Sequence, residues 1–442
     1  MRQLITRRRG GLAAGVLCLG TTAGAQEALT GALSFDAEEA QAQALKAQAT
    51  NAPAVVFPDA WHLGPVQYNL GVYAGVELDD NVNETQSSPQ SDTVLSGGLN
   101  LGFIWPATEQ SEVDLSSSVG YAKYLRYSAH DQLQIAPGSV LSWKIGFEDG
   151  SLTFFDQFSD SQSVITVASV SGVSGLPRID NTAGVRAEWD PGRWLFQLGA
   201  SYDYFFSDAA IDDYLNRGTE NFYVRGGHRL VEDTQAGLEA SVSLTRYDLP
   251  LQSNNTSYSL GPYFQWQVTH FLQTSVRGGY TIYAFDANPN GQSAYNLDSY
   301  YANLTVTHQL TEFVSQNLAV ERDISLGLAQ GNNYTEQWFA KYSLDWTATP
   351  HLGLNLNLSW TAGNEPLTGY TAEIISGIPV PVYFPYTINE NYRQTGITPG
   401  ITYQFTQKLG GTLSYSHWER TSNLAGTGYQ NNILSLQLNY SF

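Results

Sequence analysis

Apolar residues recur at every second position through most of this 442-residue chain. Clear examples are the even-numbered residues of 68–78, the odd-numbered residues of 95–105, and the even-numbered residues of 194–204 and 352–360. A strand places such a set on one face, whereas a helix scatters it around its axis. The pattern therefore predicts a chain built almost entirely of β-strands with one apolar face each.

The composition decides what this apolar face meets. Charged residues make up only 14% of the chain, against about 25% in an average soluble domain. The mean hydropathy is nevertheless −0.24, and no apolar run approaches the ~20 residues of a membrane-spanning helix. A transmembrane β-barrel combines these two properties, because its apolar residues are spread over alternate positions.

Short and long connections alternate strictly between the strands. Eight short turns lie at 106–110, 148–151, 190–193, 231–234, 269–271, 310–313, 348–351 and 407–410. Nine longer polar stretches lie at 79–92, 128–132, 159–180, 207–219, 248–256, 286–297, 329–335, 363–389 and 421–429. Seventeen connections give eighteen strands. Barrels of this kind have even strand numbers, short periplasmic turns and long outer loops. We therefore expect an all-β fold: a transmembrane antiparallel up-and-down β-barrel of about 18 strands over residues 66–442, with a short N-terminal periplasmic segment.

The N-terminus has the features of a secretory signal peptide over residues 1–25. Four arginines precede the apolar run Leu12–Leu19, and Ala23-Gly24-Ala25 is an A-x-A cleavage site. Cleavage would remove the chain's single Cys and single Met, which excludes a disulfide or a cysteine metal site from the mature chain. Residues 26–65 are rich in Ala, Gln and Glu. They predict a flexible periplasmic linker with a short helix over 36–49; the alternative is a plug or a handle for a periplasmic partner.

The C-terminal sequence points to the outer membrane. Leu434, Leu436, Leu438, Tyr440 and Phe442 alternate up to a terminal aromatic-x-Phe. This ending resembles the recognition signal of outer-membrane barrels, so we expect the barrel assembly machinery and outer-membrane lipid as partners and a Gram-negative outer-membrane location. Tryptophans near strand ends suit the headgroup level of the membrane; they are Trp105, Trp189, Trp194, Trp346 and Trp360.

The charge balance narrows the function. Cleavage would lower Lys plus Arg from 21 to 17 against 41 Asp plus Glu, for a net charge of −24 with His neutral. Such a chain is not expected to bind nucleic acid. None of the seven His stands in a triad-like pattern, so we expect no enzyme and no cofactor. Acidic and amide residues crowd 79–92, which suggests either a Ca²⁺ loop or a solvated acidic loop; its spacing does not fit a Ca²⁺ loop.

Strand parity assigns several charged residues to the inside of the barrel, because Arg or Lys on the lipid face would cost about 2–4 kcal/mol at the midplane. The predicted lumen residues with charge are Arg126, Lys144, Arg186, Glu188, Asp203, Arg225, Glu239, Arg277, Lys341 and Asp345. Inward aromatic residues include Tyr73, Tyr124 and Tyr223. Charges beside aromatic faces suit sugars; the alternative is that these groups pair with one another and line an inert wall.

The first two predicted strands resemble a known family. The segment Val76-Glu77-Leu78-Asp79-Asp80-Asn81-Val82, followed by Ser91-Asp92-Thr93, is similar to the opening of the type 2 family of β-barrel porins. The resemblance implies an outer-membrane barrel, in a family with members associated with exopolysaccharide export, and no catalytic residues. We therefore expect a porin or export conduit for polysaccharide or other polar solutes, served by periplasmic export components. The alternative is a structural or adhesive barrel whose long outer loops, including 159–180 and 363–389, bind an external ligand.

Overall fold

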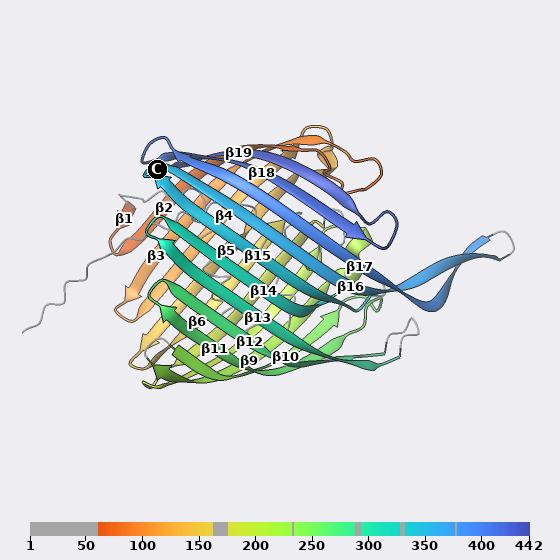
Figure 1. The fold of residues 1–442 in the computed structure, drawn as a ribbon, viewed down its shortest axis with the longest axis horizontal. Helices are drawn as coiled ribbons and strands as arrows, with labels where there is room; N and C mark the ends of the chain where they lie inside the picture. Colours follow the sequence, from red (N-terminus) through yellow and green to blue (C-terminus); the bar gives the residue numbers. More distant parts are fainter. Residues whose placement is uncertain (1–60, 162–175, 232–233, 288–292, 328–331, 376–377) are drawn as a thin grey trace, which may run out of the picture.

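The computed structural model describes residues 61–161, 176–231, 234–287, 293–327, 332–375 and 378–442, with the side chains of 137, 138, 211 and 367–388 left aside. The predicted signal peptide and helix over 36–49 lie outside the described residues. The described part forms one antiparallel sheet closed into a barrel (Figure 1). Its strands are β1 (Trp61–Leu63), β2 (Val66–Asp79), β3 (Asp92–Thr108), β4 (Ser111–Tyr124), β5 (Gln132–Phe147), β6 (Gly150–Ser161), β7 (Arg178–Trp189), β8 (Trp194–Ser207), β9 (Arg217–Val231), β10 (Thr234–Tyr247), β11 (Asn255–Thr269), β12 (Leu272–Phe285), β13 (Tyr295–Thr311), β14 (Val314–Leu326), β15 (Tyr334–Thr349), β16 (Leu352–Ile375), β17 (Ile378–Gln404), β18 (Leu409–Ser422) and β19 (Tyr429–Ser441).

The barrel wall consists of β2 to β19 in chain order, which confirms the predicted eighteen strands. Each strand pairs with its successor, and β19 returns to pair with β2 from Ile433↔Asp79 to Ser441↔Gly71. The backbone N–H of Phe442 extends this seam by donating to the carbonyl of Leu70 at 3.0 Å. β1 is a short addition to the predicted linker, since Trp61–Leu63 folds back onto the start of β2.

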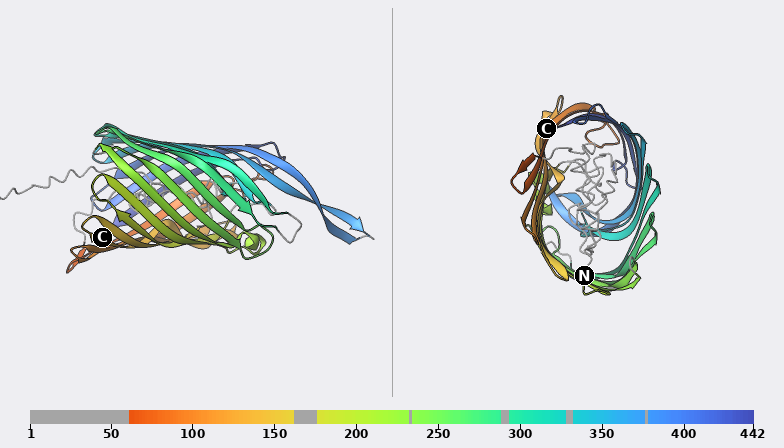
Figure 2. Two further views of the ribbon diagram at one scale, coloured as in Figure 1. Left: turned by 90° about the horizontal axis from the view of Figure 1, so that it is seen from below. Right: turned by 90° about the vertical axis from the view of Figure 1, so that its left-hand side faces the viewer.

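The barrel wall has its apolar side chains outside and its polar side chains inside, the reverse of a soluble domain. Large apolar side chains are exposed on its outer face, as with Leu198 at 60% and Leu238 at 61%, while the residues between them are polar and mostly covered. The barrel has an oval cross-section when seen along its axis (Figure 2). The predicted alternation therefore becomes a lipid-compatible outer face and a polar inner face. No described helix is long and apolar enough to cross a membrane.

Short turns gather at one rim, here called the turn end. Most of them repeat one threonine motif: the hydroxyl of Thr269 accepts the N–H of Phe271, and the hydroxyl of Thr311 accepts the N–H of Phe313, both at 3.2 Å. The same acceptor role falls to Thr108, Thr349 and Thr406. A side-chain hydroxyl that replaces a backbone acceptor fixes a tight turn.

Aromatic residues form two exposed bands on the outer face. The band near the turn end contains the exposed residues Trp105, Trp143, Trp189, Trp194, Trp266 and Trp346. The band toward the opposite rim, here called the loop end, contains the exposed residues Tyr121, Tyr202, Tyr204, Tyr258, Tyr280, Tyr300 and Trp338. Trp360 is exposed on the same face. These bands agree with the headgroup levels expected of a transmembrane barrel.

The loop end differs from the prediction at one connection. The segment 363–389 was expected as a long loop, but β16 and β17 continue through it as a paired hairpin that projects beyond the rim (Figure 1). The polar composition and the prolines suggested a loop. Pro379, Pro381 and Pro385 lie in the part of β17 that pairs with β16 but not with β18, so one edge of that part is free, and edge strands tolerate proline. Shorter 3-10 turns occupy parts of two other loops, Ser128–His130 and Ala210–Leu215.

The closing seam can be tested with a pair of cysteines, because the mature chain would have none of its own. Val76 and Leu436 face each other across the seam, and antiparallel neighbours lie within disulfide reach. We expect V76C/L436C to form a disulfide on oxidation that changes electrophoretic mobility until reductant is added. The matched control V76C/L413C places the second cysteine one strand further away and should stay reduced. Equal cross-linking in both variants would contradict the seam.

Candidate functional site in the barrel lumen

The inner wall carries a connected group of charges centred on Glu239 of β10. One carboxylate oxygen of Glu239 accepts from Nη2 of Arg225 at 2.8 Å. The other accepts from the hydroxyl of Tyr301 at 3.0 Å and lies 3.8 Å from Nη1 of Arg277. We call these four residues the Glu239 cluster. Two guanidinium groups share one carboxylate, so the cluster carries a formal charge of +1 on the inner wall.

Strand register and two glycines assemble this cluster. Arg225 stands directly opposite Glu239 on the neighbouring strand β9. Tyr301 lies on β13, three strands from β10, and reaches Glu239 across Gly261 and Gly279. A Cβ atom added at Gly261 would come within 2.6 Å of the Tyr301 hydroxyl, and one added at Gly279 within 2.7 Å of its ring. The glycines therefore clear the path that the tyrosine occupies.

Other inward aromatic residues use the same arrangement. Each lies along the wall over a glycine of an adjacent strand, where an added Cβ would collide with the ring. The pairs are Tyr73 over Gly98 and Gly120, Tyr223 over Gly199, Tyr263 over Gly227 and Gly237, and Tyr392 over Gly363. The rings therefore pack against the wall, and Tyr263, Tyr392 and Tyr223 are buried, at 2%, 6% and 7% exposure.

Three buried arginines of the inner wall stack on these or similar rings. The guanidinium carbon of Arg225 lies 4.1 Å from the ring centre of Tyr263, that of Arg217 lies 4.0 Å from Phe205, and that of Arg420 lies 4.0 Å from Tyr392. Stacking on an aromatic face stabilises a guanidinium that has lost part of its hydration. The arginines are thus held in place along the wall.

A second cluster of charges lies at the loop end. Arg420 of β18 donates to Glu390 of β17 at 3.0 Å, and the hydroxyl of Thr427 donates to the same carboxylate oxygen at 3.0 Å. Both charged residues are buried, at 3% and 4% exposure. Sequence reasoning missed this pair, because Glu390 directly follows the segment predicted as a loop. A continuous parity count through β17 would have found it.

Most of the predicted lumen residues lie on the strand face opposite the exposed apolar side chains. The residues in this position are Lys144, Arg186, Glu188, Asp203, Arg225, Glu239, Arg277, Lys341, Asp345, Tyr73, Tyr124 and Tyr223. Among them, Arg225, Glu239 and Arg277 come together in the Glu239 cluster. Elsewhere the amide of Gln197 donates to Glu188 at 3.0 Å, and that of Asn221 donates to Asp203. Their role in transport stays a prediction.

Arg126 is the exception among these residues. The structure places it beyond the end of β4, exposed in a bend, with its guanidinium on the backbone and hydroxyl oxygens of Ser91. The carboxylate of Asp92 accepts the backbone N–H groups of Arg126 and Tyr127, which draws the chain out of the sheet. The alternation of inward and outward side chains holds only within a strand, and β4 ends at Tyr124. The prediction that Arg126 faces the lumen was therefore wrong.

The acidic segment 79–92 is folded back on itself and against β19. Asn81 is 2% exposed, and its side-chain amide donates to the backbone oxygens of Thr85 and Gln430. Burial, aided by the nearby carboxylate of Asp79, raises the pKa of Glu84 to about 8. Among the described residues, no group of three or more His, Cys, Asp or Glu is placed to hold a metal ion. The described geometry of this segment is therefore that of a packed loop.

Comparison with known proteins finds similar barrels among solved structures. Pseudomonas aeruginosa OccK2 (OpdF), solved in complex with glucuronate, has a TM-score of 0.47 at 11% identity, covering 85% of this chain and 98% of that chain. The Pseudomonas aeruginosa outer membrane protein OpdK has a TM-score of 0.44 at 11% identity, covering 85% and 99%. OmpT, an outer membrane protein of Vibrio cholerae, has a TM-score of 0.39 at 11% identity, covering 87% and 100%.

No protein-family model matches the chain, and no curated protein matches it. All three TM-scores lie below 0.5. The assignment of the fold therefore rests on the pairing of the chain's own strands, which close a transmembrane-type barrel of eighteen strands.

The fit of an aromatic ring over a glycine gives a measurable prediction. In G199A the new methyl group would overlap the Tyr223 ring and push it from the wall into the lumen. We expect a smaller single-channel conductance and a loss of about 1–3 kcal/mol in the free energy of unfolding, as for other overpacked sites. The double variant G199A/Y223A should regain conductance. In the control G146A the added methyl meets only a backbone oxygen at 3.5 Å, so conductance should not change. A normal conductance in G199A would contradict the arrangement.

Proposed function

We propose that this protein is an outer-membrane channel for polar, negatively charged solutes. The observation that carries the proposal is the Glu239 cluster, which places two arginines and one carboxylate on the wall of a closed barrel. A net positive charge beside a narrow, low-dielectric lumen attracts anions and repels cations. The polar inner face and apolar outer face support a water-filled passage through lipid, since barrels of this strand number leave an aqueous channel unless plugged.

Sugar acids fit this wall best among the anions. A carboxylate matches the planar fork of an arginine, and sugar hydroxyls match the polar side chains that alternate with the apolar ones along the strands. Export of an acidic polysaccharide is the finer form of this proposal. It is supported by the resemblance of the first two strands to type 2 β-barrel porins, and it would require export components on the periplasmic side.

The sign of the selectivity can be tested by two variants of the same cluster. R277Q leaves Arg225 paired with Glu239 and removes one positive charge from the inner wall, so we expect the reversal potential in a salt gradient to shift toward cation preference. E239Q leaves both arginines without their carboxylate, so the shift should go the opposite way, toward stronger anion preference. Both variants keep similar side-chain shapes, and correct folding is checked by heat-modifiable mobility. Unchanged reversal potentials in both would refute the role of the cluster.

The orientation of the barrel is part of the proposal. An outer-membrane protein with its short turns in the periplasm exposes the connection between β2 and β3 to the outside. Ser87 and Glu109 are exposed and lie at opposite rims, in a loop and in a turn respectively. On intact cells, a membrane-impermeant maleimide should label S87C strongly and E109C only after the outer membrane is permeabilised. The reverse result would invert the topology.

A second candidate function is a structural or adhesive barrel. It is favoured by the hairpin of β16 and β17, which projects beyond the loop end (Figure 1). Planar-bilayer conductance separates the two functions, because an adhesive scaffold with a closed lumen passes no ions. A deletion of the projecting part of the hairpin should leave conductance intact if the channel is the main function.

A further inference from the structure

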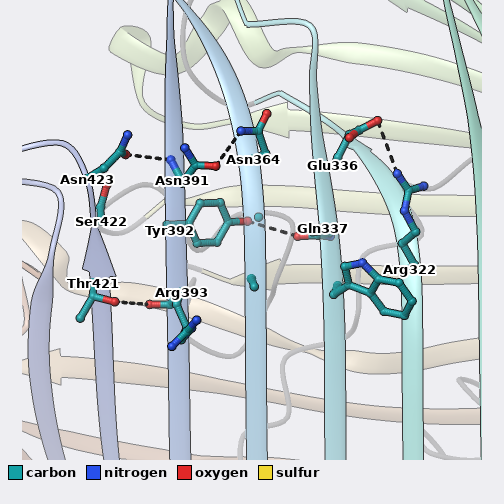
Figure 3. A pocket seen from close by; sticks show the side chains of 13 residues that line it. Arg322, Glu336, Gln337, Asn364, Asn391, Tyr392, Arg393, Thr421, Ser422 and Asn423 are labelled. Carbon is teal, nitrogen blue, oxygen red and sulfur yellow. Dashed lines mark hydrogen bonds and ion pairs between the residues drawn. The ribbon is translucent and has the colours of Figure 1, made fainter.

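The outer face of the barrel has a polar groove at the loop end, across β14 to β18. It has a volume of about 570 Å³ and is formed by two rows of side chains, and the row between them, with Ser422, Tyr392, Gly363 and Gln337, also lines it (Figure 3). The upper row contains Asn423, Asn391, Asn364 and Glu336 on consecutive strands, and the lower row contains Thr421, Arg393, Ala362, Trp338 and Arg322. We call it the outer groove. Elsewhere this face is dominated by exposed apolar side chains.

The height of the outer groove places it next to lipid headgroups. Its Trp338 and the adjacent Tyr300 belong to the aromatic band toward the loop end, and both are exposed on the outer face. Such bands mark the boundary between the hydrocarbon and the headgroups. The asparagine row lies closer to the rim than Trp338, and therefore on the headgroup side of this boundary.

The two arginines of the groove differ in how they are held. Arg322 donates to the hydroxyl of Ser299 at 2.9 Å, lies 3.5 Å from the carboxylate of Glu336 and covers the ring of Tyr300. Arg393 is exposed, and its guanidinium has no hydrogen-bond or ion-pair partner among the residues that the structure describes; only its backbone oxygen accepts a bond, from Thr421. A cation on the lipid-facing side is costly unless it meets the polar headgroups. Arg393 is thus placed to bind an anion.

The space between the arginines suits a sugar. Ala362 lies between Arg393 and Trp338 in the lower row, so its small side chain leaves the floor of the groove open. Above it, the amide of Asn364 donates to Asn391 at 2.8 Å, and the side-chain oxygen of Asn423 accepts the backbone N–H of Asn391 at 2.8 Å. Among the described contacts, this leaves the amide nitrogen of Asn391 for a bound group, and Trp338 lies exposed beside Ala362. Amides and an aromatic face are what a hydroxylated ring requires.

We propose that the outer groove binds the phosphorylated sugar headgroup of a glycolipid from the surrounding leaflet. The phosphate pairs with Arg393, and the sugar ring lies over Ala362 beside Trp338. The ligand is a membrane lipid, because the groove opens sideways on the outer face of the wall and not into the lumen. This inference rests on insertion of the barrel in a membrane with the loop end outward, as proposed above, but not on conduction or on its selectivity.

The test measures lipid retained by the purified barrel. Wild type, R393Q and R246Q are refolded, incubated with detergent micelles containing diphosphorylated lipid A, and analysed by native mass spectrometry. Arg246 is the matched control: it is exposed on the outer face at the loop end of β10, with its guanidinium on the backbone oxygens of Thr245 and Asn255. We expect wild type and R246Q to retain lipid A and R393Q to retain several-fold less. The conductance of R393Q should equal that of wild type, which separates this site from the lumen.

Several outcomes would overturn the proposal. Equal retention in R393Q and wild type would remove the role assigned to Arg393, and equal loss in R246Q would show only a general effect of outer-face charge. Equal retention of dephosphorylated lipid A would exclude phosphate recognition. Displacement of lipid A by millimolar inorganic phosphate alone would point to a site for free anions. A variant A362F, which fills the floor of the groove without changing its charge, should also lose lipid; full retention would exclude binding over Ala362.

Discussion

The whole structure depends on the requirement that every backbone N–H and C=O within the hydrocarbon finds a partner in the chain itself. A sheet meets that requirement only when its two edges join, since lipid offers no hydrogen bonds. Here β19 pairs with β2, and the backbone of Phe442 adds one more hydrogen bond at this seam. Closure fixes which face of each strand points inward, and so it places each polar residue in the lumen or on the outer face.

Much of this architecture was predictable from the sequence, because a barrel strand with one lipid-facing side alternates apolar and polar residues. The strand number, the alternation of short turns with longer loops and the face of most charged residues all follow from a period of two. The two wrong predictions lie where a strand ends earlier, or extends further, than the sequence pattern indicates. At Arg126 the carboxylate of Asp92 captures backbone N–H groups and ends the strand early. At 363–389 pairing between β16 and β17 continues through a proline-containing segment that suggested a loop.

The sites themselves were less predictable, because they depend on register between strands. Parity assigned Glu239 and Arg277 to the lumen, but it could not show that they meet two strands apart. Nor could it show that Tyr301 reaches the same carboxylate over two glycines. The outer groove was missed for a related reason. Its arginines lie at positions that a simple rule excludes from the lipid face, and that rule holds for the midplane and weakens toward the headgroups.

The repeated threonine turns make the two rims of the barrel different. At the turn end, one hydroxyl in each such turn accepts a backbone N–H within the chain reversal. Each of these hairpins therefore has a bond of its own that supports its register at the turn. At the loop end, the described connections differ from one another in length and composition. Loops of other lengths and chemistry could be grafted there, one hairpin at a time, while the bore and the lining of the barrel stay as they are.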